Sequence, residues 1–272
     1  MKFSVLMSLY FKENPAHFRL SLDSILNQTI IPDQIVIVID GPVSDELNSI
    51  VTEYASKNPK QFTILQLLKN SGMGIAFNHG LNACRNDLVA RMDTDDIAVY
   101  DRFEKQIQFF QLHPEISILG GTILEFINSP GDINQYKYLP TDHISILRYA
   151  KYRSPFSHAT VMYRKEHVIA SGSYKLKEYE DYFLWIRMFM RGYKAANLKD
   201  VLVYSRIGNK FIERRLGLVY AKREIKFCKL AYRIHFFNYF DFIRFLAMRI
   251  PLRFIPRFVL AFIYKYILRN QL

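Results

Sequence analysis

The first 115 residues alternate short apolar runs with amphipathic segments, and this alternation constrains the fold more than any other feature of the chain. Residues 35–39 read Ile-Val-Ile-Val-Ile, which is typical of a parallel strand buried on both faces. The expected strands are residues 3–9, 34–40, 62–68 and 87–92, and the expected helices between them are residues 15–28 with Asn14 as N-cap, a segment capped by Ser44, and residues 74–85. This order predicts a doubly wound, mostly parallel α/β sheet.

The second half of the chain alternates less regularly but still favours completion of the same sheet. Extended segments are expected at residues 117–127, 159–163 and 195–205, and helices at residues 142–152 and 179–190. No repeat, low-complexity segment or flexible linker marks a domain boundary before residue 206. Residues 1–206 are therefore expected to form one domain.

Three carboxylates in four residues, Asp93, Asp95 and Asp96, directly follow the predicted strand 87–92. Open α/β sheets bind ligands at the carboxyl ends of their strands. Clustered carboxylates repel one another unless a cation compensates them, and a hard divalent ion prefers oxygen ligands. The cluster therefore predicts a site for a metal ion and a phosphate group. The alternative is that Asp95 or Asp96 caps the helix expected to begin near residues 100–103.

The other predicted strands also end in residues that suit a nucleotide. Ser8 and Tyr10 end the first strand, Asp40 ends the second, and Asn70 and Gly72 follow the third. The Tyr10 ring could stack on a base, and Asp40 could accept the N3–H of uracil. Asn70 and the glycine turn allow close backbone approach. Each signal is weak alone, but parallel strands would bring all of them to one edge of the sheet.

The order of these motifs resembles the family 2 glycosyltransferases, which have the GT-A fold and assemble O-antigen, capsule and exopolysaccharide in bacteria. The resemblance covers about residues 3–206 and lies in residues 5–10, 24–29, 38–41, 70–72, 91–96 and 180–181. It implies a GT-A, Rossmann-like domain with a nucleotide-binding half at residues 1–115 and an acceptor half at residues 116–206. The family usually ends its second strand in Asp-Asp-Gly-Ser, whereas this chain has a single Asp40 before Gly41-Pro42.

The resemblance also implies roles for individual residues. The residues implied to bind the nucleotide-sugar are Ser8, Tyr10, Asp40, Asn70, Gly72, Asp93 and Asp95. The metal, Mn²⁺ or Mg²⁺, would be held by Asp95, by Asp96 or by both. Asp181 would be the catalytic base, with Glu180 beside it on the acceptor side.

A transferase of this kind needs a carboxylate on the face of the sugar opposite the leaving group, because the acceptor hydroxyl must lose its proton during attack. One direct displacement then inverts the anomeric carbon. Asp181 leads into the predicted helix 179–190, so helix capping is the alternative role for Glu180 or Asp181. His158 is expected on the acceptor side, although a lone histidine is more often structural. Arg206 could contact the diphosphate or the acceptor, or begin the basic tail.

The last quarter of the chain is strongly basic. The formal charge of the protein is +12, and residues 206–272 hold 15 Lys/Arg against 3 acidic residues. Basic residues alternate there with aromatic and aliphatic ones, and Pro251 and Pro256 divide the segment. Residues 207–272 are therefore expected to form a basic amphipathic helical extension that lies on an anionic membrane. The alternative is a helical subdomain packed on the body. Nucleic acid is not expected as a partner, because no nucleic-acid-reading motif accompanies the charge.

Together these features predict an inverting, metal-dependent transfer of a hexose from a nucleotide-sugar, expected to be a UDP-sugar, to a lipid-linked saccharide acceptor in surface polysaccharide or lipopolysaccharide synthesis. Two alternatives are a sugar nucleotidyltransferase and a non-catalytic membrane-bound protein of the same fold. The first would need a glycine-rich loop after the first strand, where residues 10–15 read Tyr-Phe-Lys-Glu-Asn-Pro. Two cysteines without paired spacing fit a reducing compartment. The expected location is the cytoplasmic face of the cell membrane, as a peripheral protein.

Overall fold

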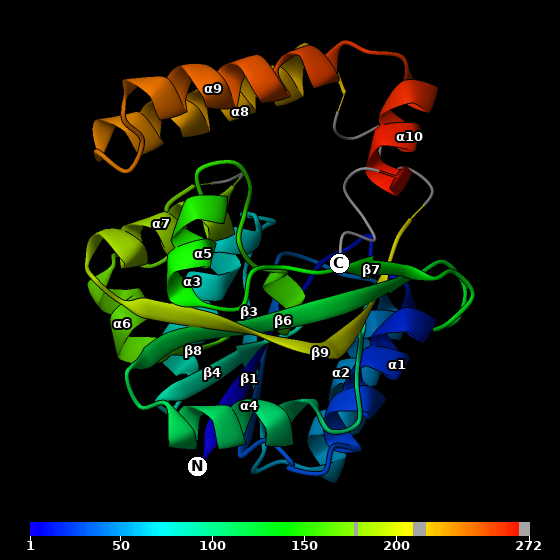
Figure 1. The fold of residues 1–272 in the computed structure, drawn as a ribbon. Helices are drawn as coiled ribbons and strands as arrows, with labels where there is room; N and C mark the ends of the chain where they lie inside the picture. The colour runs from blue at the N-terminus through cyan, green and yellow to red at the C-terminus, as the bar shows by residue number, and fades with distance from the viewer. Residues whose placement is uncertain (177–178, 209–215, 267–272) are drawn as a thin grey trace.

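The computed structural model describes residues 1–176, 179–208 and 216–266. One mixed sheet forms the centre, with helices on both faces, and a helical hairpin lies above one end (Figure 1). The strands are β1 Phe3–Leu9, β2 Gln34–Ile39, β3 Phe62–Gln66, β4 Leu88–Arg91, β5 Ile97–Ala98, β6 Ile116–Phe126, β7 Gln135–Lys137, β8 Met162–Arg164 and β9 Lys194–Arg206. The helices are α1 Pro15–Leu26, α2 Asp45–Lys57, α3 Met73–Ala83, α4 Arg102–Leu112, α5 His143–Tyr149, α6 Lys165–Ala170, α7 Glu180–Met190, α8 Gly217–Arg233, α9 Tyr239–Arg249 and α10 Arg257–Tyr266, with 3₁₀ turns at His158–Thr160 and Pro251–Arg253.

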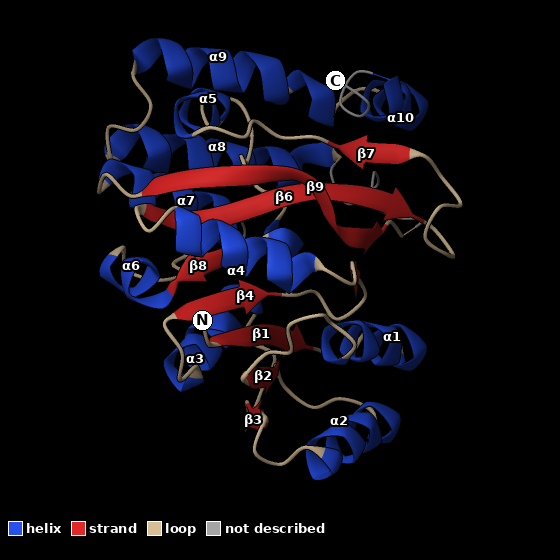
Figure 2. Ribbon diagram, turned by 60° about the horizontal axis from the view of Figure 1, so that its bottom comes forward, coloured by secondary structure: helices blue, strands red, loops and turns tan. Residues whose placement is uncertain are grey.

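The strand order β3-β2-β1-β4-β8-β6-β9-β5 creates a topological switch point between β1 and β4 (Figure 2). The chain runs outward from β1 to β2 and β3, then returns to place β4 on the other side of β1. These four strands are parallel, so their carboxyl ends lie at one edge of the sheet. Ligands of open α/β sheets bind at such a point, where the two neighbouring connections diverge.

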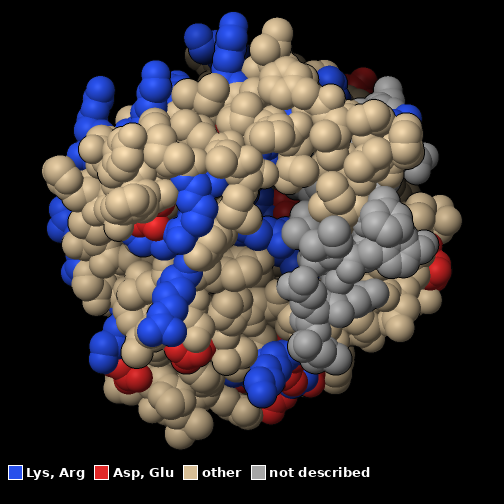
Figure 3. Space-filling model, turned by 45° about the horizontal axis from the view of Figure 1, so that its top comes forward, with Lys and Arg blue, Asp and Glu red and all other residues tan. Residues whose placement is uncertain are grey.

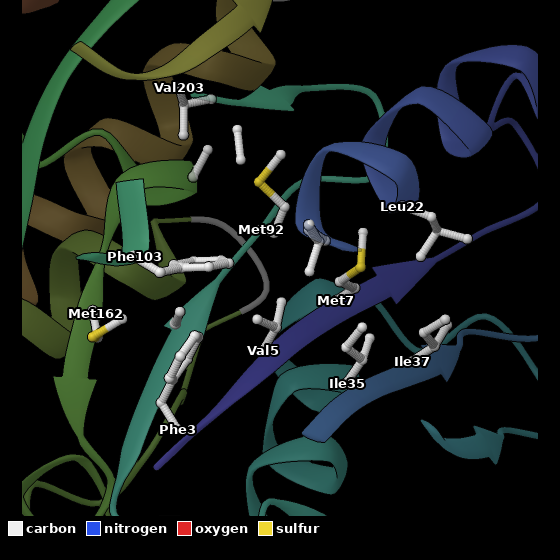
Figure 4. Packing of buried hydrophobic residues seen from close by; sticks show 14 of the residues in the cluster. Phe3, Val5, Met7, Leu22, Ile35, Ile37, Met92, Phe103, Met162 and Val203 are labelled. Atoms are coloured by element: carbon white, nitrogen blue, oxygen red, sulfur yellow. The ribbon is translucent and has the colours of Figure 1, made fainter. Parts of the chain in front are cut away.

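Two apolar cores lie on opposite faces of the sheet because successive strand residues point to opposite sides. Val5, Met7, Ile35 and Ile37 face α1, α2 and α4, as the packing around Leu22 and Phe103 shows (Figure 4). Leu6, Val36 and Val38 face the other way and pack against α3 and α7. Both faces of β1 and β2 are therefore buried, which explains their nearly continuous apolar sequences.

The elements expected from the sequence are largely confirmed. β1 begins and ends as predicted, and the other expected strands and helices differ by a few residues at their ends. Asn14 caps α1 by accepting from the backbone N–H groups of Ala16 and His17, and Ser44 caps α2. The strand predicted at residues 159–163 is partly wrong. Residues 158–160 form a 3₁₀ turn, in which the Thr160 hydroxyl donates to the Ser157 carbonyl, and β8 begins only at Met162.

Two helices of the basic extension pack on the body of the protein. Phe227 and Ala231 of α8 and Phe245 of α9 are buried in the same core as α7. Residues 209–215 and 267–272, with the tail residue Arg269, lie outside the described residues. Within the described part of the chain, no helix is both long and apolar enough to span a bilayer. Binding of this extension to a membrane stays a prediction.

A buried ion cluster fastens this hairpin. The Glu224 side chain is fully buried; it accepts from Nε of Arg249 at 2.6 Å and from Nε of Arg253 at 2.7 Å. Removing one partner of such a cluster leaves the opposite charges buried without compensation.

We therefore expect Glu224→Ala to lower the free energy of unfolding by about 3–5 kcal/mol, because Arg249 and Arg253 would keep their charges in a dry site. Urea denaturation followed by circular dichroism measures this loss. Glu46→Ala, at an exposed position of α2, is the matched control and should cost under about 1 kcal/mol. Equal losses for the two variants would contradict the prediction.

Candidate active site

The acidic cluster lies immediately after β4, at the switch point. β5 pairs with β9 and holds the far end of the cluster against that strand. The backbone N–H of Arg206, at the end of β9, donates to Oδ1 of Asp96 at 2.8 Å. The Arg206 Nε donates to the backbone oxygen of Asp95 at 3.2 Å. The capping alternative for Asp95 and Asp96 is wrong, because the N-cap residue of α4 is Asp101.

The carboxylates of the cluster raise one another's proton affinity. Burial, with the nearby charges of Asp93 and Glu13, raises the pKa of Asp95 to about 7. Burial and the charges of Asp93 and Asp95 raise the pKa of Asp96 well above its ordinary value. Burial also raises the pKa of Glu13, which accepts a hydrogen bond from the Thr94 hydroxyl. The site therefore concentrates negative charge that a cation would relieve.

The raised pKa of Asp95 predicts how the stability of the protein depends on pH in the absence of added metal. Between about pH 4 and pH 7 the folded protein holds a proton on Asp95 that the unfolded chain releases, so the free energy of unfolding falls as pH rises. We expect Asp95→Asn, measured in chelator, to melt at a higher temperature than the wild type at pH 7.5. The difference should shrink toward pH 4, with a slope of at most about 1.4 kcal/mol per pH unit. Superimposable melting curves at pH 7.5 would count against the prediction.

Asp40 organises the loop that follows β3. It is 2% exposed, and its Oδ1 and Oδ2 accept from the backbone N–H groups of Ser71 at 2.7 Å and Gly72 at 2.9 Å. The Asn70 side chain donates to the Asp40 backbone oxygen at 3.2 Å. Gly41 has a φ of +86°, and a Cβ there would lie 2.5 Å from the backbone nitrogen of Asn70. Asp40 therefore fixes the conformation of the loop through these hydrogen bonds. Its direct contact with a base stays a prediction.

Ser8 lies near the end of β1, and Tyr10 directly follows that strand. Tyr10 is 37% exposed and its ring meets Phe11 edge to face at 5.9 Å between centroids. Ser8 is partly buried and pairs in register with Val38 of β2. Both residues thus occupy the edge of the sheet that holds Asp40, as the sequence predicts.

Asp181 lies in the first turn of α7, partly buried. Burial raises its pKa, although the backbone N–H of Tyr182 and the charges of Arg91 and Lys137 favour the ionised form. The helix N-terminus alone would lower the pKa, so burial outweighs it here. A carboxylate with raised proton affinity is better suited to accept a proton at neutral pH. The position of Asp181 at a helix N-terminus is therefore compatible with a base, and its catalytic role stays a prediction.

Gly74 brings the start of α3 against the start of α7. A Cβ at Gly74 would lie 2.9 Å from the Leu176 backbone oxygen and 3.4 Å from Cβ of Glu180. The start of α3, directly after the loop at residues 70–72, and Glu180 therefore lie side by side, although they are more than 100 residues apart in the chain. Tyr179, which precedes this pair, has a φ of +58° and its hydroxyl donates to Oε1 of Glu224 at 3.1 Å.

Arg91 connects the two acidic parts of the site. It is 2% exposed, pairs with the Asp93 carboxylate and lies over the ring of Phe77 at 4.9 Å. Its charge also acts on Asp96 and Asp181. Neither Arg91 nor Glu13 is assigned a role of its own by the sequence motifs. The position of Arg91 inside the apolar run 88–92 was a sequence signal that this residue has a special role. The sequence held no such signal for Glu13, which lies beside Thr94 only in the folded protein.

His158 lies in an aromatic cluster with Phe77, Tyr174 and Trp185. Its Nε2 is 3.2 Å from the Tyr174 hydroxyl. Burial, together with the charge of Arg91, lowers the pKa of His158 well below its ordinary value, so the imidazole is neutral at pH 7. The packing suits a structural role, and a contact with the acceptor stays a prediction.

The described residues contain no group of three or more His, Cys, Asp or Glu side chains arranged to hold a metal ion. Two neighbouring carboxylates, Asp95 and Asp96, remain as oxygen donors. Mg²⁺ sites in nucleotide-dependent enzymes commonly combine one or two carboxylates with phosphate oxygens of the substrate. The donor set thus fits a metal that binds together with a diphosphate.

A sheet of this topology with an acidic cluster at its switch point is the GT-A glycosyltransferase architecture. The model for "Glycosyl transferase family 2" matches residues 4–179. The chain belongs to this family of glycosyltransferases. Family membership favours the predicted transferase over both alternatives, a nucleotidyltransferase and a non-catalytic protein.

Several bacterial relatives match along nearly the whole chain. An uncharacterized glycosyltransferase of Haemophilus influenzae is 44% identical over 99% of this chain and 100% of its own length. The UDP-Gal:alpha-D-GlcNAc-diphosphoundecaprenol beta-1,3-galactosyltransferase of Escherichia coli is 40% identical over 100% and 98%. The amylovoran biosynthesis glycosyltransferase AmsE of Erwinia amylovora is 39% identical over 97% and 98%. The chain is therefore similar to enzymes of polysaccharide assembly.

Solved structures share the fold at low sequence identity. Staphylococcus aureus TarS 1–349 in complex with UDP-GlcNAc superposes with a TM-score of 0.69 at 21% identity, covering 92% of this chain and 72% of that one. The mannosyltransferase PcManGT of Pyrobaculum calidifontis, in complex with GDP-Man and Mn²⁺, has a TM-score of 0.65 at 15% identity, covering 98% and 81%. These likenesses confirm the predicted GT-A fold.

Proposed function

We propose that the protein transfers a hexose from a UDP-sugar to a saccharide linked through diphosphate to a membrane lipid, with inversion at the anomeric carbon. The observation that carries the proposal is the acidic cluster at the carboxyl end of β4, at the switch point of the sheet, where Arg91 pairs with Asp93 and its charge also acts on Asp181 of α7. The E. coli relative, named for a UDP-Gal donor and a diphosphoundecaprenol-linked acceptor and 40% identical over 100% of this chain, supports the choice of both substrates.

The donor would lie at the switch point between β1 and β4. The base would stack on Tyr10 near Ser8, in front of the loop that Asp40 orders through Ser71 and Gly72. Asp93, fixed by Arg91, would contact the ribose. Asn70 and Gly72 would allow the backbone to approach the donor closely.

Asp95 and Asp96 would hold Mn²⁺ or Mg²⁺ against the donor diphosphate. When bound, the metal would neutralise the charge that grows on the departing diphosphate. The raised pKa values of both residues support this assignment, because a cation would relieve the repulsion among Asp93, Asp95 and Glu13. The backbone N–H of Arg206 would orient Asp96 before the metal binds.

Asp181 would accept the proton of the acceptor hydroxyl as that oxygen attacks the anomeric carbon. The new carbon–oxygen bond forms on one face of the sugar while the bond to the diphosphate oxygen breaks on the other, with both bonding electrons leaving on the diphosphate. The proton ends on Asp181 and passes to solvent after product release. Glu180 beside it would contact the acceptor sugar.

A lipid-linked acceptor places the reaction at a membrane surface. We propose that the protein works at the cytoplasmic face of the cell membrane as a peripheral protein, since its proposed acceptor is linked to a lipid and the extension at residues 207–272 is basic.

The donor can be identified by following nucleoside diphosphate release from a panel of UDP-, GDP- and dTDP-sugars, with Mn²⁺ or with chelator. We expect metal-dependent release from one UDP-sugar. Release from a GDP-sugar alone would overturn the assignment of the nucleotide, and equal release in chelator would overturn the assignment of Asp95 and Asp96 to a metal.

A further inference from the structure

The hairpin of α8 and α9 has two different outer surfaces. On α8, Lys222, Lys226, Lys229 and Arg233 are exposed at spacings of four, three and four residues, so they lie on one side of the helix. They line a groove of about 370 Å³ together with Ile225 and Leu230. In the view from above, Lys and Arg side chains project along the upper edge of the molecule (Figure 3). We call these four residues the basic stripe.

The neighbouring α9 exposes apolar side chains. Phe240 is 80% exposed and Tyr239 62%, and Met248 and Ile243 are also exposed. Phe254 and Phe258, on either side of the start of α10, are exposed apolar residues as well. Large apolar side chains gathered on a surface mark an interaction site. We call Tyr239, Phe240, Ile243 and Met248 the apolar ridge.

The carboxylates of the hairpin lie inside it, so they do not weaken this positive surface. Glu224 of α8 is fully buried between Arg249 and Arg253. Asp241 of α9 is 8% exposed and pairs with Lys151 at 3.1 Å and with Arg244. The helices α8 and α9 therefore expose basic and apolar side chains but no carboxylate.

The hairpin is also fixed to the candidate active site. Glu224 accepts from the hydroxyl of Tyr179, the residue directly before Glu180 and Asp181. The ring of Phe227 stacks on that of Tyr182 at 4.3 Å between centroids. The hairpin is thus attached to the residues on both sides of Glu180 and Asp181.

We propose that the basic stripe and the apolar ridge form one docking surface for an anionic lipid bilayer, with the ridge inserted among the headgroups and the stripe on their phosphates. This proposal rests on the proposed function and assigns its membrane contact to particular residues. Lysines beside protruding aromatic residues suit anionic lipid, where apolar burial and charge attraction add. A second copy of the chain would place one basic stripe against another. Nucleic acid would leave the apolar ridge without a partner.

The test is sedimentation of the full-length protein with vesicles of phosphatidylcholine containing about one third phosphatidylglycerol, and with vesicles of phosphatidylcholine alone. We expect binding to the anionic vesicles and weak binding to the neutral ones. Lys226→Glu with Lys229→Glu should weaken binding about 10- to 100-fold, because each basic residue near an anionic surface adds attraction. Phe240→Ser should also weaken it, at unchanged charge.

Lys60→Glu with Lys199→Glu is the matched control, since it makes the same change of net charge at exposed positions outside the hairpin. It should bind vesicles as the wild type does. Wild-type binding by the stripe variant, or equal loss in the control, would overturn the proposal. So would tight binding of the wild type to nucleic acid with none to vesicles.

A parallel assay separates this proposal from the proposed function. The stripe variant should keep the wild-type transfer rate on a short-chain, water-soluble acceptor and lose rate only when the acceptor is embedded in anionic vesicles. Absence of transfer by the wild type on both acceptors would reject the proposed function, while the sedimentation result would still decide the docking surface.

Discussion

Replacing Asp181 by Asn is expected to slow sugar transfer by about 10²- to 10⁴-fold while the affinity for the donor stays within about twofold. Asn keeps the size of the side chain and its place in the first turn of α7, but it cannot accept the proton of the acceptor hydroxyl. The measurement is kcat and KM for donor and acceptor, with UDP binding followed by calorimetry. Unchanged kcat would contradict the role of Asp181 as base.

The pH dependence of kcat gives an independent check on Asp181. Because burial raises the pKa of this carboxylate, the rate should fall with decreasing pH through a value above the ordinary aspartate range of about 4. Glu180→Gln is the control variant, since Glu180 lies in the same turn and the proposal gives it no proton to carry. Its rate should change less than that of Asp181→Asn, and its pH profile should match the wild type.

The second large effect is expected at the acidic cluster. Asp95→Asn and Asp96→Asn should each lower kcat by about 10²- to 10³-fold, because each removes a charged ligand of the metal that stabilises the leaving diphosphate. The concentration of Mn²⁺ needed for half-maximal rate should rise in both variants. Titration of Mn²⁺ at saturating donor measures both quantities.

Two observations would count against this account of the cluster. One is a wild-type rate that does not change in chelator. The other is an Asp95→Asn or Asp96→Asn variant with the same Mn²⁺ requirement as the wild type. Asp101→Asn, at the start of α4 and paired with Lys105, is the matched control and should keep the wild-type requirement for Mn²⁺.

The sequence predicted the nucleotide-binding half well because local patterns determine it. Ile35 to Ile39 form a buried strand by composition, and Asn14 and Ser44 mark the starts of two helices. The four parallel strands then bring Tyr10, Asp40 and Asp95 to one edge of the sheet by topology alone. The position of the acidic cluster could therefore be predicted from the sequence.

The rest of the site depends on contacts between distant parts of the chain, which local patterns do not encode. Arg206 meets Asp96 only because β5 pairs with β9. The charge of Arg91, which pairs with Asp93, also acts on Asp181, and the start of α7 lies against the start of α3 at Gly74. One amphipathic pattern suits both a membrane surface and packing on the body, so the sequence left both open for the basic extension. The structure buries Phe227 of α8 in the same core as α7.

The most decisive experiment is transfer of a labelled hexose from a UDP-sugar to a synthetic acceptor, a GlcNAc linked through diphosphate to a short lipid. We expect a metal-dependent disaccharide product whose new linkage has the opposite anomeric configuration to that of the donor, as read by NMR. A product that retains the donor configuration would contradict the single displacement at Asp181. Donor breakdown without any transfer would contradict the assignment of the acceptor.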